Sequence, residues 1–246
     1  YNGNEFKVYK NIKNDENTIS NNMISSLVED NDKNLWIGTD GGLNKMNLDT
    51  GEITRYLVSE EDKLHSNTVV DELLIDSKGR LWVCTINGLN LYDSENDNFI
   101  KVASEYLENK GLQDIAEDDD GNIWVSTRDG LFKYNYEKNS VETFYHDEND
   151  ENTISENNIF SLHYSNDELW IGTKTGGLNI MNIKDYSIKR YVHDSNNPKS
   201  IPSNLIRDII RDKDGNIWLA TDQGLASFDE NDETFYTYTN NTDKYT

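Results

Sequence analysis

A tryptophan-centred segment recurs five times along this chain, and no other feature constrains the fold as strongly. Each copy reads aliphatic-Trp-aliphatic-small-Thr, and a Gly-Leu pair follows it after a short turn. The tryptophans are spaced by 46, 42, 46 and 48 residues, and they are Trp36, Trp82, Trp124, Trp170 and Trp218. A period of about 40 to 50 residues that contains only strand-type segments predicts a β-propeller.

Each repeat contains four segments with the composition of β-strands. The first segment alternates apolar and polar residues, and an acidic turn separates it from the tryptophan segment. The third begins at the Gly-Leu pair, and the fourth carries aromatic residues at alternate positions. We therefore predict an all-β propeller with five complete blades, each a four-stranded antiparallel sheet. The predicted blades cover residues 22–58, 68–104, 111–147, 158–193 and 204–239.

The tryptophan strand indicates how the blades pack against one another. Trp36 and Gly38 lie on one face of their strand because side chains alternate between faces. The residue two positions after each tryptophan is small, and these residues are Gly38, Cys84, Ser126, Gly172 and Ala220. We infer that the small residue allows the adjacent sheet to approach beside the indole. The five tryptophans are therefore interpreted as structural repeat residues.

Both ends of the chain fall in the middle of a repeat. Residues 1–10 contain a strand-like segment, Glu5–Lys10, which we interpret as the outer strand of a preceding blade, and residues 240–246 resemble the start of another entry loop. We expect residues 1–246 to form one propeller domain that is a fragment of a larger ring. A bare arc would expose the apolar faces of its terminal blades. Closure into a five-blade ring and pairing with a second copy both remain open, and we expect association through the terminal blades.

The charge balance argues against several classes of partner. The chain has 23 basic and 46 acidic residues and a formal net charge of −23. Such a surface repels phosphate backbones and anionic lipid, so we expect no nucleic-acid or membrane-surface binding through charge. The single cysteine, Cys84, excludes an intrachain disulfide. No apolar run approaches the roughly 18 residues of a membrane span, and no signal peptide is visible.

The acidic turns between first and second strands suggest two interpretations. Asp118, Asp120 and Asn122 present oxygens at alternate positions, as a calcium loop does. The glycine and the distant bidentate glutamate of such a loop are missing at the required positions. We therefore favour tight turns in which Asp, Asn and Gly supply positive φ angles and local hydrogen bonds. No cofactor or metal site is predicted.

The four histidines provide little support for an enzyme. The histidines are His65, His146, His163 and His193, of which His146 and His193 occupy matching places after fourth strands. Only His163, in a first strand, is placed to approach the propeller axis, and it lacks a histidine partner there. Metal-dependent propeller lyases use histidine near the axis, so a lyase is the least favoured function. Cys84 takes the small-residue position of a tryptophan strand, which predicts a buried and inert thiol.

The most variable positions within the repeat are candidates for recognition. The asparagines that open the first strands recur with the repeat, so we interpret them as caps; they are Asn21, Asn22, Asn67, Asn157, Asn158 and Asn204. The turns between second and third strands differ from blade to blade, and they should lie on the same face as the entry loops. Variable loops on a rigid frame are typical of binding surfaces. The candidate ligand-binding residues are Asp40, Asn87, Arg128, Asp129, Lys174, Thr175, Asp222 and Gln223.

Two sets of residues resemble a known family, the two-component regulator propellers. The repeat motif Asp-x-x-Gly-Asn-Ile-Trp, continuing to Gly-Leu, stands at Asp118–Leu131 and Asp212–Leu225. Ser/Asn-rich entry loops stand at residues 17–22, 152–158 and 198–204. The third repeat departs from the pattern, because its entry at residues 106–111 is short. The resemblance covers essentially the whole chain.

The resemblance implies a fold and a function. Such propellers usually have seven blades and form the extracytoplasmic sensor region of membrane-bound histidine kinases, hybrid two-component regulators or diguanylate cyclases. Some recognise oligosaccharides. We therefore expect a non-catalytic extracellular or periplasmic sensor domain in signal transduction, from a membrane-anchored parent, that binds a small ligand such as an oligosaccharide or mediates dimerisation. The alternative is a purely structural scaffold for protein interaction. Arg128 and Lys174 stand out in an acidic chain as anchors for an acidic sugar or a partner carboxylate.

Overall fold

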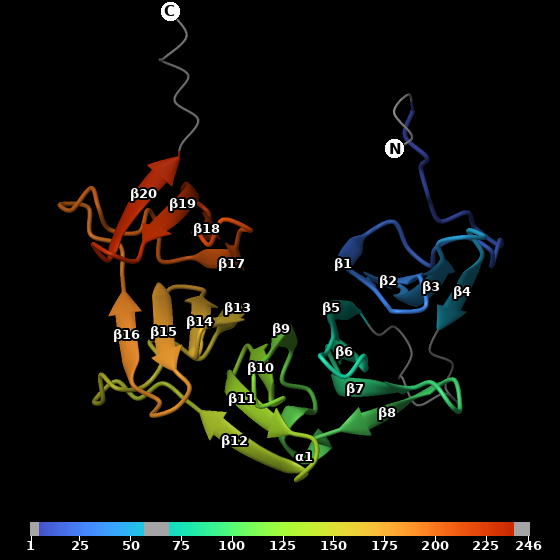
Figure 1. The fold of residues 1–246 in the computed structure, drawn as a ribbon, viewed down its shortest axis with the longest axis horizontal. Helices are drawn as coiled ribbons and strands as arrows, with labels where there is room; N and C mark the ends of the chain where they lie inside the picture. Colours follow the sequence, from blue (N-terminus) through green and yellow to red (C-terminus); the bar gives the residue numbers. More distant parts are fainter. Residues whose placement is uncertain (1–4, 57–68, 239–246) are drawn as a thin grey trace, which may run out of the picture. The chain divides into compact units, whose positions relative to one another are not determined.

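The structure, a computed structural model, describes residues 5–56 and 69–238 of the chain. Within these residues it contains five four-stranded antiparallel sheets and one short helix (Figure 1). The chain divides into two compact units, Tyr1–Leu112 and Gln113–Thr246. Blades 1 and 2 belong to the first unit and blades 3 to 5 to the second. The all-β propeller-blade architecture is thus confirmed, and the assignment to one domain stays a prediction.

The strands of every blade follow one another in space as they do in sequence. Blade 1 contains β1 (Ile24–Glu29), β2 (Asn34–Thr39), β3 (Gly42–Asn47) and β4 (Ile53–Tyr56). Blade 2 contains β5 (Val70–Ile75), β6 (Leu81–Thr85), β7 (Gly88–Asp93) and β8 (Asn98–Val102), and α1 (Ser104–Leu107) follows it. Blade 3 contains β9 (Leu112–Glu117), β10 (Ile123–Thr127), β11 (Gly130–Asn135) and β12 (Ser140–Phe144). Blade 4 contains β13 (Ile159–Ser165), β14 (Glu168–Thr173), β15 (Leu178–Asn182) and β16 (Ile188–Tyr191). Blade 5 contains β17 (Ile206–Arg211), β18 (Ile217–Thr221), β19 (Gly224–Asp229) and β20 (Thr234–Tyr238). All of these strands fall within the predicted blade spans.

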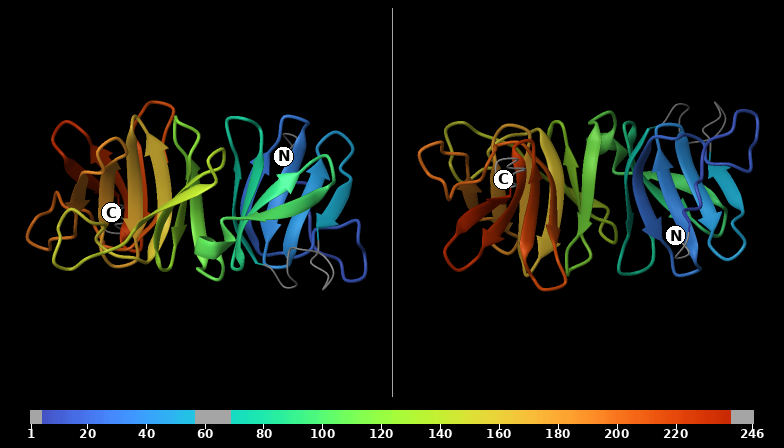
Figure 2. Two further views of the ribbon diagram at one scale, coloured as in Figure 1. Left: turned by 90° about the horizontal axis from the view of Figure 1, so that it is seen from below. Right: turned by 90° about the horizontal axis from the view of Figure 1, so that it is seen from above.

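Within each unit the blades pack face to face (Figure 2). First strands of neighbouring blades lie against each other, as β1 does against β5 and β13 against β17. The clusters around Trp36, Trp124 and Trp170 each combine residues of two blades, whereas the cluster around Ile37 and Met46 belongs to blade 1 alone. One cluster joins Trp170 and Leu178 of blade 4 to Ile206, Ile209 and Phe228 of blade 5.

The tryptophans lie on second strands, as predicted, and four of them are buried. Trp36, Trp82, Trp124 and Trp170 are at most 1% exposed, whereas Trp218 of blade 5 is only partly buried. The next blade of the same unit covers Trp36 and Trp170. Burial of an aromatic side chain of this size stabilises the fold by about 2–3 kcal/mol.

The small residue two positions after the tryptophan has the predicted role at Gly38 and Gly172. A Cβ atom built on Gly38 would lie 2.7 Å from Cγ1 of Val70 in the next blade. A Cβ atom on Gly172 would lie 2.7 Å from Cγ2 of Ile206. The first strand of the following blade therefore occupies the space that a side chain would need.

The acidic turns anchor the tryptophans by hydrogen bonds. The Trp124 indole N–H donates to Oδ2 of Asp118, six residues earlier, at 2.9 Å. Oδ1 of Asp118 accepts from the backbone N–H groups of Asp120 and Asn122 and from the Asn122 amide. The same Asp-Trp bond joins Asp30 to Trp36, Asp76 to Trp82 and Asp212 to Trp218, each at 2.8 Å. These carboxylates thus accept N–H groups of their own turn, which supports the tight-turn interpretation.

The same hydrogen bonds change the pKa of Asp212. Hydrogen bonds from the side chains of Asn216 and Trp218 favour its ionised form and lower its pKa to about 2.

Blade 4 departs from this pattern because its first turn is shorter. Ser165 pairs with Glu168 across a two-residue turn in which Asn166 and Asp167 both have positive φ. Tyr164 therefore stands six residues before Trp170, where the other blades have aspartate. Among the described residues, the Trp170 indole nitrogen is buried without a hydrogen-bond partner.

The predicted outer strand at Glu5–Lys10 is not a strand in the structure. The structure assigns no regular secondary structure to residues 5–12, whose Phe6 and Val8 side chains are 78% and 67% exposed. A strand needs a neighbouring strand to accept its ladder hydrogen bonds. No such ladder to residues 5–10 is present in the described parts of the chain. The alternation of apolar and polar residues is therefore not sufficient to predict a strand at residues 5–10.

The contact between Gly38 and Val70 can be tested by a double-mutant cycle. We expect Gly38→Ala to lower the free energy of unfolding by about 1–3 kcal/mol through overpacking. In a Val70→Ala background the same change should cost less, because the clashing methyl groups are gone. Denaturant unfolding measures both values, and equal costs in the two backgrounds would contradict the contact.

The hydrogen bonds that Asp118 accepts can be tested by comparison with Asp120, a nearby residue of equal charge. We expect Asp118→Asn to destabilise the protein by about 1–3 kcal/mol, because it replaces an acceptor oxygen that faces buried N–H donors. Asp120→Asn makes the same charge change in the same turn at an exposed side chain, and it should cost less than about 0.5 kcal/mol. Chemical denaturation of both variants provides the comparison, and similar losses would argue against the anchor.

Candidate functional site

The entry loops of blades 1 and 4 are clamped by a pair of side chains from their own blade. In blade 4, the buried Asn179 on β15 accepts the backbone N–H of Ser155 at 2.8 Å. Arg190, opposite Asn179 on β16, donates from Nε to the carbonyl oxygen of Thr153 at 3.0 Å and from Nη2 to that of Asp150 at 3.1 Å. The clamp holds the loop by its backbone.

Blade 1 has the same clamp, formed by Asn44 and Arg55. Asn44 accepts the backbone N–H of Ser20 at 2.8 Å, and Arg55 donates to the carbonyl oxygens of Thr18 and Asp15. Blades 3 and 5 lack both residues of the clamp, since Phe132 and Ala226 take the asparagine position. Among the entry loops that the structure describes, the clamp therefore holds those of blades 1 and 4.

The asparagines that open the first strands act as structural caps. Oδ1 atoms of Asn22, Asn157 and Asn204 accept the backbone N–H groups of Asn11, His146 and His193, respectively. Nδ1 of each histidine lies 2.8 Å from a loop carbonyl oxygen, that of Ile154 or Ile201. His146 and His193 thus occupy matching places, as predicted, and close their loops. Asn67 and His65 lie outside the described residues.

The turns between second and third strands lie beside the entry loops, as predicted. Asp40 N–H donates to the carbonyl oxygen of Met23 at 3.2 Å, and Lys174 N–H donates to that of Asn158 at 3.0 Å. The Glu156 carboxylate accepts the N–H groups of Thr175 and Gly176. A threonine closes every such turn by donating to a glycine carbonyl oxygen, as Thr127 does to Gly130 at 2.9 Å. The backbone of each turn is therefore held while its outer side chains remain free to differ.

The structure brings part of the predicted site together in the second unit. Asn157 accepts Gly130 N–H, after the Arg128–Asp129 turn, and Asn158 accepts Lys174 N–H. These two consecutive loop carbonyls therefore link the turns of blades 3 and 4. The next link joins Gly177 N–H to the carbonyl oxygen of Asn204 at 3.0 Å.

The predicted residues differ little in exposure. Seven of them are exposed and Asn87 is half-buried; the exposed ones are Asp40, Arg128, Asp129, Lys174, Thr175, Asp222 and Gln223. Asp40 and Asn87 belong to the first unit and the other six to the second. Their assignment to ligand binding stays a prediction.

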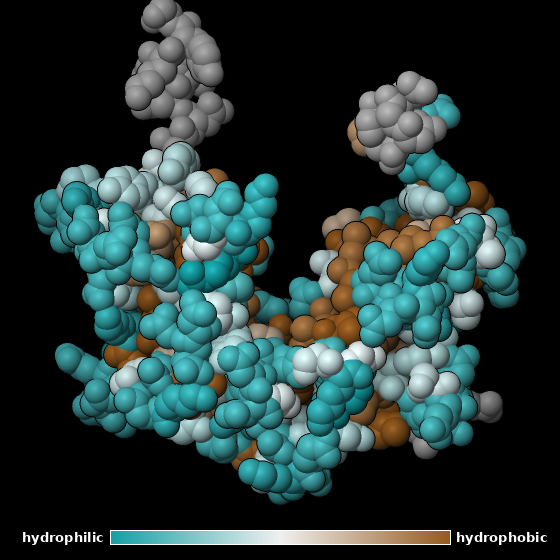
Figure 3. All heavy atoms as spheres, viewed as in Figure 1, coloured by the Kyte–Doolittle hydropathy of each residue, from teal (hydrophilic) through white to brown (hydrophobic). Residues whose placement is uncertain are grey.

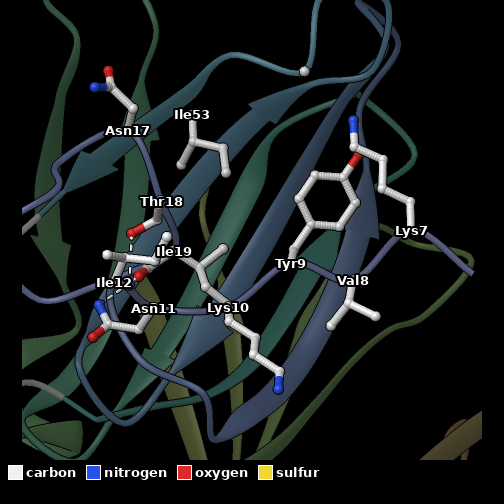
Figure 4. Close-up of a pocket in the computed structure, with 11 residues that line it drawn as sticks. Lys7, Val8, Tyr9, Lys10, Asn11, Ile12, Asn17, Thr18, Ile19 and Ile53 are labelled. Carbon is white, nitrogen blue, oxygen red and sulfur yellow. Dashed lines mark hydrogen bonds between the residues drawn. The ribbon is translucent and has the colours of Figure 1, made fainter.

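Two of the grooves in the described part of the first unit are lined by residues outside these turns. One has a volume of about 690 Å³ and lies between residues 7–12 and the blade 1 entry loop, with Ile53 at its edge (Figure 4). Lys7 Nζ lies 4.7 Å above the ring of Tyr9 there. The prediction of a strand at Glu5–Lys10 gave no indication of a groove. The available signal in the sequence was that this segment departs from the repeat.

The other groove, of about 320 Å³, lies where blades 1 and 2 meet. The hydroxyls of Tyr56 and Tyr92 both donate to Oδ1 of Asp97 at 2.7 Å. Burial, together with the Asp97 carboxylate, raises the pKa of both phenols. The three groups therefore form a strut between the blades.

His163 lies between blades rather than in an open cavity. It pairs with Trp170 across β13 and β14 and shares the face that packs on blade 5. Burial lowers its pKa, and the Arg211 charge contributes to the shift. Cys84 is fully buried in β6. Over residues 5–56 and 69–238, no group of three or more His, Cys, Asp or Glu side chains is arranged to hold a metal ion.

The repeat is also found in a described protein family. The family model for the two component regulator propeller matches residues 18–41, 106–129 and 200–223. These three segments match the repeat that this family model describes. They include the clamped blade 1 entry loop, the short entry to blade 3 and the blade 5 entry loop. No curated protein matches the chain.

Solved structures with a similar fold include extracellular domains of two-component systems. The chain is similar to the extracellular domain of BT3049 from Bacteroides thetaiotaomicron, assigned as a hybrid two-component system, at 26% identity and a TM-score of 0.73. This alignment covers 89% of the chain and 31% of that domain. The extracellular domain of BT4673 from the same organism matches at 24% identity and a TM-score of 0.68, over 88% of the chain and 27% of that domain. The chain therefore spans about a third or less of these two extracellular domains.

A propeller enzyme has a similar fold. Virginiamycin B lyase from Staphylococcus aureus matches at 15% identity and a TM-score of 0.67, over 93% of the chain and 72% of the lyase. At this identity the likeness concerns the fold alone. In the described part of the chain, no helix has the length and hydropathy of a membrane span.

The loop clamp can be tested on one strand. We expect Arg190→Ala to speed hydrogen exchange in residues 147–155 about tenfold, because the loop loses hydrogen bonds worth about 1.4 kcal/mol. Lys189→Ala removes the same charge from the adjacent residue, whose side chain contacts Glu233 of blade 5. It should leave exchange in this loop unchanged. Equal acceleration in both variants would contradict the clamp.

Proposed function

We propose that this chain is a non-catalytic, extracytoplasmic sensor propeller of a membrane-bound signal-transduction protein. The similarity to extracellular domains assigned to hybrid two-component systems supports this function. Histidine kinase and diguanylate cyclase domains are the outputs that the family resemblance suggests. The observation that carries the proposal is the set of exposed, divergent turns held on a rigid frame by backbone hydrogen bonds.

The proposed ligand is an oligosaccharide that carries a carboxylate. Arg128 and Lys174 are exposed on turns that the loop at Asn157–Asn158 links. Guanidinium and ammonium groups bind carboxylates by charge-assisted hydrogen bonds. The net charge of −23 makes a local basic pair necessary for an acidic ligand, because the remaining surface repels it. Asp129, Thr175, Asp222 and Gln223 would supply hydrogen bonds to sugar hydroxyls.

A structural scaffold is the second candidate function. The exposed apolar side chains on blades 1 and 5 favour it, because contiguous exposed apolar surface is typical of interaction sites. A metal-dependent lyase receives less support, because His163 is packed between blades.

Titration calorimetry with neutral and uronic-acid oligosaccharides tests the proposal. We expect binding of an acidic oligosaccharide, and a Kd about tenfold weaker for the double variant Arg128→Ala/Lys174→Ala, which corresponds to about 1.4 kcal/mol. Lys138→Ala/Lys213→Ala makes the same charge change on exposed turns that follow third and first strands, at the opposite ends of the blades. This control should retain the affinity of the parent chain.

Two results would argue against this function. Absence of binding to every oligosaccharide at millimolar concentration would favour the scaffold. Equal weakening in the two double variants would show that net charge, rather than these turns, controls affinity.

A further inference from the structure

The turn between β14 and β15 is one residue longer than the matching turns of the other blades. Thr173 donates its hydroxyl to the carbonyl oxygen of Gly177, four residues later, at 2.8 Å. The matching threonines of blades 1, 2, 3 and 5 donate to a glycine three residues later. The sequence shows the same insertion, as Thr-Lys-Thr-Gly-Gly at residues 173–177. The extra residue changes which acceptors the backbone N–H groups of the turn use.

Three of the five N–H groups in this turn donate to backbone carbonyl oxygens. Thr173 N–H donates to Gly177 at 3.1 Å within the turn. The N–H groups of Lys174 and Gly177 donate to the loop carbonyl oxygens of Asn158 and Asn204, both at 3.0 Å. These bonds fix the backbone of the turn against two entry loops. The two central N–H groups of the turn donate to a side chain instead.

The two central N–H groups converge on a single carboxylate oxygen. Thr175 N–H and Gly176 N–H donate to Oε2 of Glu156 at 2.5 and 3.0 Å, respectively. Successive backbone N–H groups that point to one place form an anion-binding concavity, and their bonds to a carboxylate are charge-assisted. The turns of blades 1, 3 and 5 use the threonine hydroxyl as acceptor, as Asp129 N–H does with Thr127 at 2.9 Å. Glu156 thus occupies an anion site that its own chain provides.

The backbone on both sides of this anion site is held in place. A Cβ atom at Gly176 would lie 2.5 Å from Oγ of Ser155 and 3.1 Å from Cβ of Glu156, so the glycine permits the loop to come this close. Asn179 accepts the Ser155 N–H and donates to its hydroxyl. The Glu156 side chain is half-buried and follows directly after this clamped residue. Rotation of that side chain alone therefore opens the site without a movement of the loop.

Lys174 adds a positive charge beside the anion site. It immediately precedes Thr175, and its side chain is exposed. Hydrophilic residues dominate the surface of the second unit that Figure 3 shows, and the net charge of the whole chain is −23. Most of such a surface repels a carboxylate, so an acidic ligand binds where N–H donors and an ammonium group are concentrated.

We propose that the N–H groups of Thr175 and Gly176, with the Lys174 ammonium group, bind the carboxylate of a uronic acid, and that Glu156 closes this site until the ligand displaces it. The ligand carboxylate takes the place of the Glu156 carboxylate, which turns out into solvent. Glu156 lowers the apparent affinity, because only molecules with this side chain displaced can bind. This assignment rests on the proposed function, since it names the groups that bind the acidic sugar and the residue that competes with it.

An amide NMR titration with D-galacturonate, a uronic acid monosaccharide, tests the proposal. We expect galacturonate to shift the amide proton signals of Thr175 and Gly176, with a Kd about tenfold lower for Glu156→Ala than for the parent chain. Glu151→Ala removes the same charge at an exposed side chain of the same loop, and its Kd should equal that of the parent chain. Galactose, which lacks the carboxylate, should shift neither signal.

Three results would overturn the proposal. An equal Kd for the parent chain and Glu156→Ala would show that Glu156 does not compete, and an equal gain in Glu151→Ala would show an effect of net charge. Unmoved Thr175 and Gly176 signals in Glu156→Ala would show that the turn does not bind the carboxylate. The amide signals of Lys174 and Gly177 establish that the turn is intact in the variant. Glu156→Gln, which removes the charge and keeps the size of the side chain, should also lower the Kd and replaces Glu156→Ala if the turn is disturbed.

The carboxylate site and the proposed function can fail separately. If an acidic oligosaccharide binds in calorimetry with a Kd that Glu156→Ala leaves unchanged, the assignment of this site is wrong and the proposed function stands. If galacturonate shifts the Thr175 and Gly176 signals as expected but no oligosaccharide binds, the carboxylate site stands and the oligosaccharide function is wrong.

Discussion

The packing of one blade's tryptophan against the next blade's first strand is the contact on which the rest of the structure depends. Each blade alone is a small twisted sheet with two apolar faces, and such a sheet is stable only when both are covered. The small residue two positions after the tryptophan lets the next sheet approach, and the Asp-Trp hydrogen bond fixes the indole. Blade 4 shows that the packing tolerates the loss of this bond, since Trp170 is buried without a partner for its nitrogen.

This stacking also explains why the turns can vary in sequence from blade to blade while the blade faces cannot. The backbone of each variable turn is tied to an entry loop, and Asn179 and Arg190 tie one such loop to its blade. Outer side chains on these turns therefore change without disturbing the core. The blade faces behave differently, because their residues must match a neighbouring blade.

The local sequence pattern predicted the strands and turns because the same pattern recurs in every repeat. The same pattern wrongly predicted a strand at Glu5–Lys10. Apolar and polar residues alternate there, but no strand in the described part of the chain lies alongside to complete a hydrogen-bond ladder. The interpretation of His163 as a residue near the axis missed its packing on blade 5, which depends on strand register. The Asp-Trp anchors had a visible signal, an aspartate six residues before four of the five tryptophans. The sequence signal for the loop clamp was weaker, because the Asn-Arg pair occurs in only two blades, as Asn44 with Arg55 and as Asn179 with Arg190.

Residue-resolved hydrogen exchange tests the central claim most directly. If tryptophan packing between blades holds the frame, amides of β2, β6, β10 and β14 should exchange only through global unfolding. Amides of the turns after these strands should exchange through smaller openings. Exchange of the tryptophan strands as fast as the turns would contradict the account, because the blades would then open without breaking the contact that is said to join them.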